Sequence, residues 1–176
     1  MIVVDLKENN IHKYIDELIR IDNQLVDMHG IKYSLERWDA NNFLLNLLGK
    51  WDYSFVALGE NYEVVGCIIA SQDIDHSVHI NRLFVDNKYV CMGVGSLLLR
   101  YLEIRVRKNR LSTISLFVNI NNIHGINFYV KNGFIRLEGD KLKSKLKQTN
   151  RNICQETFIK NRAQNKTLYM YEKFLR

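Results

Sequence analysis

The stretch NKYVCMGVGSLLL, residues 87–99, decides how this chain is interpreted. Gly93 and Gly95 precede a run of leucines, a pattern that predicts a tight turn into a buried helix. The first N–H groups of such a helix have no partner within it, so they can bind phosphate without a cationic side chain. A purely structural turn is the alternative. The stretch is neither GxGxxG, because position 98 is leucine, nor a P-loop ending in GK[ST].

Length and composition predict one globular domain over residues 1–176. Hydrophobic residues make up 47% of the chain, which argues against disorder. We find no run of 18 apolar residues and no secretory leader, so we expect a cytoplasmic protein with no membrane partner. The three cysteines lie far apart without a CxxC pair, which suits reduced thiols and predicts no metal site.

The net charge of +6 is unevenly distributed along the chain. Residues 1–60 contain six Lys/Arg against ten Asp/Glu, a balance of −4, so the remaining residues carry +10. A basic half could attract nucleic acid or an anionic cofactor. No aromatic residues are interleaved with the lysines of residues 141–147. An ordinary solvated surface is therefore favoured there, and nucleic acid is disfavoured as a partner.

Hydrophobic periodicity predicts strands and helices in the order βααβββαβαβ. The expected elements are a strand (1–6), two helices (10–28, 34–51), a hairpin (54–71), a strand (77–85), a helix (96–110), a strand (113–118), a helix (122–132) and a strand (167–175). Asn10 and Ser34 are candidate N-caps of the first two helices. Residues 140–166 follow no clear pattern, although they could contribute another strand.

Two motifs in this order of elements resemble the GNAT superfamily of N-acetyltransferases. The resemblance extends over about residues 1–138 and the final strand. The phosphate loop of the family, Arg/Gln-x-x-Gly-x-Gly/Ala, corresponds to residues 90–95. Its later helix, Asn-x-x-Ala-x-x-x-Tyr and then Gly-Phe, corresponds to Asn122, Gly125, Tyr129, Gly133 and Phe134. The resemblance implies an α/β (α+β) fold with a mixed, mostly antiparallel central sheet flanked by helices.

The same resemblance implies acetyl-CoA as co-substrate. Its pyrophosphate would bind to Cys91, Met92, Gly93, Val94, Gly95 and Ser96. Its pantetheine would pair like an added strand with Leu83, Phe84 and Val85, for which core packing is the alternative role. Val90 stands where the family has Arg or Gln, and Cys91 where glycine is frequent. A side-chain contact to the pyrophosphate is therefore missing, although the backbone N–H groups remain.

Tyr129 is the candidate general acid. The resemblance implies that it protonates the coenzyme sulfur, and Asn122 would lie near the coenzyme. Asn122 and Tyr129 are seven residues apart, so they share one face of a helix. A packing role for the tyrosine and a plain capping role for the asparagine are the alternatives.

His79 is the candidate general base. It stands where many members of the family carry a glutamate, and the ordinary histidine pKa of about 6.5 suits neutral pH. Strand alternation predicts that His79 shares a face with Leu83 and Val85. A second group of family members has its glutamate at the position of Phe117, which cannot take a proton. A packing histidine, with a water relay to an acidic residue of the N-terminal helices, is the alternative.

The resemblance implies an N-acetyltransferase that transfers an acetyl group directly to a primary amine. The alternative is a coenzyme-binding or regulatory domain with weak or absent catalysis, consistent with Val90 and the absent glutamates. A nucleic-acid-binding module is the third hypothesis. The acceptor would be a small molecule or a protein amine, and the charge of residues 1–60 favours a cationic one, such as a polyamine, an aminoglycoside or a lysine side chain. A homodimer is a candidate assembly.

Overall fold

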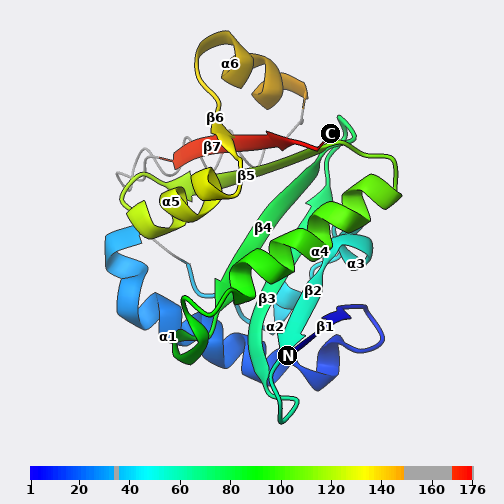
Figure 1. Ribbon diagram of the computed structural model, residues 1–176, viewed down its shortest axis with the longest axis vertical. Helices are drawn as coiled ribbons and strands as arrows, with labels where there is room; N and C mark the ends of the chain where they lie inside the picture. Colours follow the sequence, from blue (N-terminus) through cyan, green and yellow to red (C-terminus); the bar gives the residue numbers. More distant parts are fainter. Residues whose placement is uncertain (34–35, 149–167, 176) are drawn as a thin grey trace.

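The computed structural model describes residues 1–33, 36–148 and 168–175, and in this part of the chain seven strands form one sheet (Figure 1). The strand order is β1-β2-β3-β4-β5-β7-β6. Neighbouring strands are antiparallel except β4 and β5, which are parallel. This confirms the mixed, mostly antiparallel sheet. The strands are β1 (Ile2–Asp5), β2 (Phe55–Leu58), β3 (Val64–Gln72), β4 (Val78–Val85), β5 (Thr113–Asn119), β6 (Ile135–Arg136) and β7 (Leu168–Phe174).

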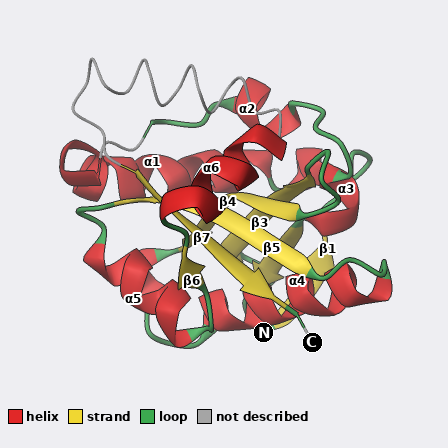
Figure 2. Ribbon diagram, turned by 90° about the horizontal axis from the view of Figure 1, so that it is seen from above, coloured by secondary structure: helices red, strands yellow, loops and turns green. Residues whose placement is uncertain are grey.

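Helices cover both faces of the sheet (Figure 2). The α1 face carries α1 (Ile15–Tyr33) and α6 (Gly139–Gln148), and the α4 face carries α4 (Val94–Lys108) and α5 (Ile123–Lys131). The shorter helices are η1 (Ile11–Lys13), α2 (Ala40–Leu44), α3 (Lys50–Tyr53) and η2 (Asn87–Tyr89). Within the described ranges, we find no helix with the length and apolar character needed to cross a bilayer.

Each face of the sheet buries its own hydrophobic core. On the α4 face, α4 contributes a stripe of buried side chains, namely Val94, Leu98, Leu99, Leu102 and Val106. Apolar residues at this spacing fall on one side of a helix, which explains why α4 packs along the sheet. The α1 face has a second core, to which Ile15, Leu18 and Ile21 of α1 belong. The leucines that follow the glycine turn therefore anchor the start of α4 against the sheet.

The segment before β2 differs from its prediction. The sequence predicts one helix over residues 34–51, whereas the described residues form two short helices, α2 and α3. Asp39 caps the start of α2, and the buried Lys50 donates hydrogen bonds to the carbonyls of Phe43 and Leu45 at its end. Burial lowers the pKa of Lys50 to about 8. The other candidate cap of this segment, Ser34, lies outside the described residues.

The segment after α5 adds two elements that the predicted order lacks. The short strand β6 pairs with β7 at the edge of the sheet. Residues 139–148 form the helix α6 instead of a strand, and the rest of the unassigned segment, residues 149–166, lies outside the described part of the chain. The final strand is confirmed as β7.

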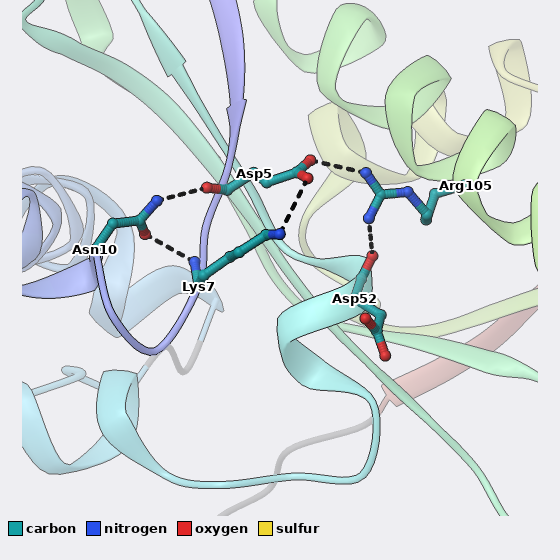
Figure 3. Close-up of polar contacts among 5 residues, drawn as sticks. All are labelled: Asp5, Lys7, Asn10, Asp52 and Arg105. Carbon is teal, nitrogen blue, oxygen red and sulfur yellow. Dashed lines mark hydrogen bonds and ion pairs between the residues drawn. The ribbon is translucent and has the colours of Figure 1, made fainter.

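The first strand is tied to α4 by polar contacts (Figure 3). Arg105 donates to the carboxylate of Asp5 at 2.8 Å and to the carbonyl of Asp52 at 2.9 Å. Asn10 does not cap a long helix, because η1 comes before α1. Its side chain instead donates to the carbonyl of Asp5 at 2.9 Å and accepts from the N–H of Lys7 at 2.8 Å.

Candidate active site

A bulge in β4 marks the centre of the candidate site. Consecutive residues of β3 pair with Ile80 and Arg82, so Asn81 is an extra residue in β4. The Asn81 side chain donates to the hydroxyl of Ser71 on β3 at 2.8 Å. Arg82 forms an ion pair with the buried Asp22 of α1 at 2.5 Å. The bulge is therefore held in place by polar contacts to β3 and to α1.

The bulge also changes the face of the sheet on which His79 lies. Val78 and Ile80 belong to the core of the α4 face, and Leu83 and Val85 pack against the same core. Because His79 alternates with Val78 and Ile80, its side chain lies on the α1 face. The prediction that His79 shares a face with Leu83 and Val85 is wrong, because the extra residue reverses the alternation between them.

The parallel ladder between β4 and β5 is short. It joins Val78–Ile80 to Ile114–Leu116 and includes no later pair, although both strands are fully described. Beyond this point β4 continues beside β3, and β5 continues beside β7. The two strands diverge (Figure 1), so residues 81–85 and 117–119 form no ladder with one another. An extended ligand could pair with such an edge as an added strand.

The loop after β4 presents backbone N–H groups at the start of α4. Cys91 and Gly93 adopt positive φ values of 64° and 83°. The N–H of Leu97 donates to the carbonyl of Gly93 at 2.9 Å, so the three preceding N–H groups have no acceptor within the helix. A Cβ added to Gly93 would meet nothing within 4 Å. Open space beside a row of N–H donors fits a phosphate group.

The second glycine of the loop has a different role. A Cβ on Gly95 would lie 3.3 Å from the ring of Phe128 in α5 and 3.7 Å from Val85 in β4. The missing side chain therefore lets α5 pack closely beside the diverging part of β4. Val90 is 49% exposed and brings no charge to the loop, so the phosphate-binding capacity of the loop lies in its backbone.

Side chains that the sequence analysis missed hold this loop on two sides. Asp86 accepts a hydrogen bond from the N–H of Lys88 at 3.0 Å and pairs with Arg20 of α1 at 3.4 Å. The Tyr89 hydroxyl donates to Glu63, in the turn between β2 and β3, at 2.5 Å. This bond lowers the pKa of Glu63 and raises that of Tyr89. The partners are 26 and 66 residues apart, so no local pattern could reveal them.

α5 positions two of the predicted site residues. Asn122 caps the helix, because its Oδ1 accepts the N–H of Gly125 at 2.9 Å. Tyr129 is half-buried against the core of the α4 face, and its ring centroid lies 5.2 Å from that of Phe128 and 5.5 Å from that of Phe134. Burial raises the pKa of Tyr129, which keeps its hydroxyl protonated. Within the described residues this hydroxyl has no hydrogen-bond partner, so a ligand could accept its proton.

His79 lies where β4 and β5 begin to diverge, one residue before the last ladder pair of β4. It is 4% exposed. Its Nδ1 lies 2.9 Å from the Oγ of Ser115 on β5, and its ring centroid lies 5.3 Å from that of Phe117. His79 and Tyr129 therefore flank the diverging strands on opposite faces of the sheet.

A buried ion-pair cluster lies close to His79. Lys145 of α6 contacts Asp75, in the turn between β3 and β4, and Glu172 of β7, each at 2.7 Å. Glu172 pairs with Ser115 in the ladder, so the cluster is next to the hydrogen bond of His79. Burial opposes the charge of Asp75, but hydrogen bonds from Lys145 and a serine outweigh it and lower its pKa. In the sequence, Lys145 is one of several alternating lysines, and only the fold distinguishes it.

The described residues include no group of three or more His, Cys, Asp or Glu side chains that could hold a metal ion. The candidate site contains backbone N–H donors, a diverging strand edge, a tyrosine and a histidine.

Comparison with known proteins identifies a family and similar folds. A model described as the Acetyltransferase (GNAT) family matches residues 15–134. The fold is similar to that of an acetyltransferase of the GNAT family from Staphylococcus aureus Mu50, with 17% identity, a TM-score of 0.71 and 99% of each chain covered. It is also similar to the PaiA N-acetyltransferase from Thermoplasma acidophilum, solved in complex with coenzyme A, with 16% identity, a TM-score of 0.68 and 98% of each chain covered. The ribosomal-protein-S18-alanine N-acetyltransferase from Escherichia coli has 15% identity and a TM-score of 0.66, over 99% of this chain and 93% of that one.

Proposed function

The chain belongs to the GNAT family of acetyltransferases, and from this premise we propose that it transfers the acetyl group of acetyl-CoA directly to a primary amine. The observation that carries the proposal is the divergence of β4 and β5 immediately before the loop with unpartnered N–H groups. The divergence offers a strand edge to the pantetheine, and the loop offers donors to the pyrophosphate.

The residues present fit this co-substrate. Leu83, Phe84 and Val85 offer their backbone groups to the pantetheine while their side chains pack into the two cores. The loop residues 91–96 hold the pyrophosphate, and the open space at Gly93 accommodates it. Asn122 fixes the start of α5 and thereby the position of Tyr129 along the coenzyme.

The two proton transfers take place on opposite faces of the sheet. His79, on the α1 face, accepts the proton of the ammonium group directly or through water. Tyr129, on the α4 face, donates its proton to the sulfur of the departing coenzyme A. The C–N bond of the amide forms as the C–S bond of the thioester breaks, and coenzyme A leaves as the thiol. The nitrogen releases its second proton to solvent as the amide forms, and Tyr129 regains a proton from solvent. Because β4 and β5 form no ladder beyond Ile80 and Leu116, a thioester paired with the edge of β4 would lie between the two strands, with His79 on one face of the sheet and Tyr129 on the other.

We further propose that the acceptor is a cationic amine that approaches from the α1 face. Residues 1–60 carry a balance of −4, and they include α1, a helix of that face. A polyamine, an aminoglycoside or a lysine side chain of a protein has the required charge. Cys67 and Cys91 are free thiols, which supports a cytoplasmic location.

A panel of amines tests the proposal. Purified protein is incubated with acetyl-CoA and spermidine, an aminoglycoside, a lysine-containing peptide or a neutral amine. Thiol release and the mass of the acetylated amine are measured together. Binding of acetyl-CoA is measured separately as a rise in melting temperature. Binding without product from any amine would favour the coenzyme-binding domain without catalysis, and the absence of binding would overturn the proposal.

A further inference from the structure

The hydrogen bond between His79 and Ser115 decides which nitrogen of the imidazole can take a proton. Nδ1 of His79 lies 2.9 Å from Oγ of Ser115, and the two residues are directly paired in the parallel ladder between β4 and β5. His79 is buried, and Ser115 is fully buried. A serine hydroxyl can donate to Nδ1 or accept a proton from it. If it accepts, Nδ1 carries the ring proton and Nε2 carries the lone pair of the base.

Carboxylates on the side of Ser115 away from His79 favour this second arrangement. Glu172 is paired directly with Ser115 across the β5–β7 ladder, so the two side chains are neighbours on the α1 face. Lys145 joins Glu172 to Asp75 and lies 2.7 Å from each carboxylate. Two carboxylates and one ammonium group leave an excess of negative charge beside the hydroxyl of Ser115.

The charged groups of β4 and of the turn before it do not offset this negative field. Arg82, in the bulge of β4, is paired with the buried Asp22 of α1. Asp73, in the turn between β3 and β4, is a further buried acid. A hydroxyl group rotates to suit its surroundings, and its hydrogen points toward negative charge. Oγ of Ser115 then turns a lone pair toward Nδ1 of His79.

We propose that Ser115 and Glu172 are positioning residues that hold His79 in the Nδ1–H tautomer, with Nε2 as the nitrogen that accepts the proton of the acceptor amine. The inference rests on the proposed function, which makes His79 the base. In the proton step, an N–H bond of the ammonium group breaks and an N–H bond forms at Nε2. The resulting imidazolium keeps its Nδ1–H bond to Ser115, and the excess negative charge of the cluster stabilises it. Solvent removes the proton before the next turnover.

Nitrogen-15 NMR of the imidazole ring tests the tautomer without turnover, at an alkaline pH where histidine is neutral. The signal is assigned by its loss in His79→Gln, and we expect the Nδ1–H form to predominate in the native protein. Ser115→Ala should lower the ratio of the Nδ1–H form to the Nε2–H form by about fivefold, the factor for one net hydrogen bond. Glu172→Gln should lower this ratio although the hydroxyl remains. Ser54→Ala is the matched control, because it removes a buried hydroxyl that contacts the backbone of Ala70, and it should keep the native ratio.

Turnover then shows whether the tautomer matters to the reaction. Ser115→Ala should lower kcat by about fivefold with an amine from the panel and leave the affinity for coenzyme A unchanged. In the His79→Gln background the same change should have no further effect, because a positioning residue acts only through the base. Equal losses in both backgrounds would assign Ser115 a packing role and overturn the inference.

The NMR and kinetic results distinguish a wrong tautomer from a wrong reaction. A native protein in the Nε2–H form, or an unchanged tautomer ratio in Ser115→Ala, overturns the inference even where acetyl transfer is observed. Absence of product with every amine refutes the proposed function, and the role of the tautomer falls with it. Where Glu172→Gln fails to fold, Ser115→Ala decides the question by itself, because it leaves both ion pairs of Lys145 in place.

Discussion

Replacing Tyr129 with phenylalanine separates its chemical role from its packing role. The ring makes contacts with Phe128 and Phe134, with centroids 5.2 Å and 5.5 Å away, and phenylalanine keeps them. The hydroxyl makes no hydrogen bond within the described part of the chain, so its removal leaves no buried partner unsatisfied. We therefore expect the free energy of unfolding to change by less than about 1 kcal/mol.

The effect on turnover should be much larger. A positioned general acid contributes 10²–10⁴-fold, so we expect kcat to fall by about 10²-fold, or roughly 2.7 kcal/mol of transition-state stabilisation. Coenzyme affinity should stay the same, because the proton is needed only as the thiolate leaves. Burial raises the pKa of Tyr129, so the hydroxyl stays protonated at neutral and mildly alkaline pH. The native rate should therefore show no fall due to Tyr129 in that range.

The assay is steady-state thiol release with an amine from the panel, together with calorimetric binding of coenzyme A. Tyr101→Phe is the matched control, because Tyr101 of α4 is 41% exposed and its hydroxyl has no proposed role. A Tyr129→Phe protein with native kcat would refute the acid assignment. A loss confined to coenzyme affinity would show instead that the hydroxyl contributes to binding.

Three further perturbations test the site and the fold. Gly93→Val should abolish most of the rise in melting temperature that acetyl-CoA causes. A φ near +83° is strained for a branched side chain, and that side chain would cover the N–H groups of the loop. An undiminished rise would exclude the loop as the binding site. His79→Gln should remove the rise of kcat with pH for an acceptor amine of low pKa, and an unchanged profile would make His79 a packing residue. Lys145→Met should lower the free energy of unfolding by roughly 3 kcal/mol, because it leaves the half-buried Asp75 and the buried Glu172 without their cation. Lys141→Met, on the exposed side of α6, should not lower it, and equal effects of the two changes would show that the ion pairs add no stability.

Much of the fold could be predicted because its signals are local. The apolar stripe of α4, the glycine turn before it and the hairpin of β2 and β3 each depend on neighbouring residues with a fixed period. The cap at Asn122 and the seven-residue spacing to Tyr129 are equally local, and both are found in α5. The resemblance of these motifs to a known family then indicated the sheet as a whole.

The errors lie where particular side-chain contacts override the helical or strand pattern. Residues 34–51 have a helical pattern, but the described part of this segment folds as two short helices. The side chain of Lys50, the first residue of α3, is buried and donates to carbonyls at the end of α2. The helix α6 is mostly polar, and its position against the sheet depends on the pairing of Lys145 with Asp75 and Glu172. These two partners lie far from α6 in the sequence.

The amino-acid sequence by itself determined the order of the main elements, the glycine loop and the tyrosine helix, because periodicity and spacing act over a few residues. Only the tertiary structure decided on which face of the sheet each reactive group lies. One extra residue in β4, Asn81, reverses the alternation and places His79 on the face opposite to Leu83 and Val85. No side-chain pattern in β4 marks this bulge, because it is defined by hydrogen-bond pairing with β3. The divergence of β4 from β5 likewise depends on which backbone groups find partners, and that is settled only when the whole sheet forms.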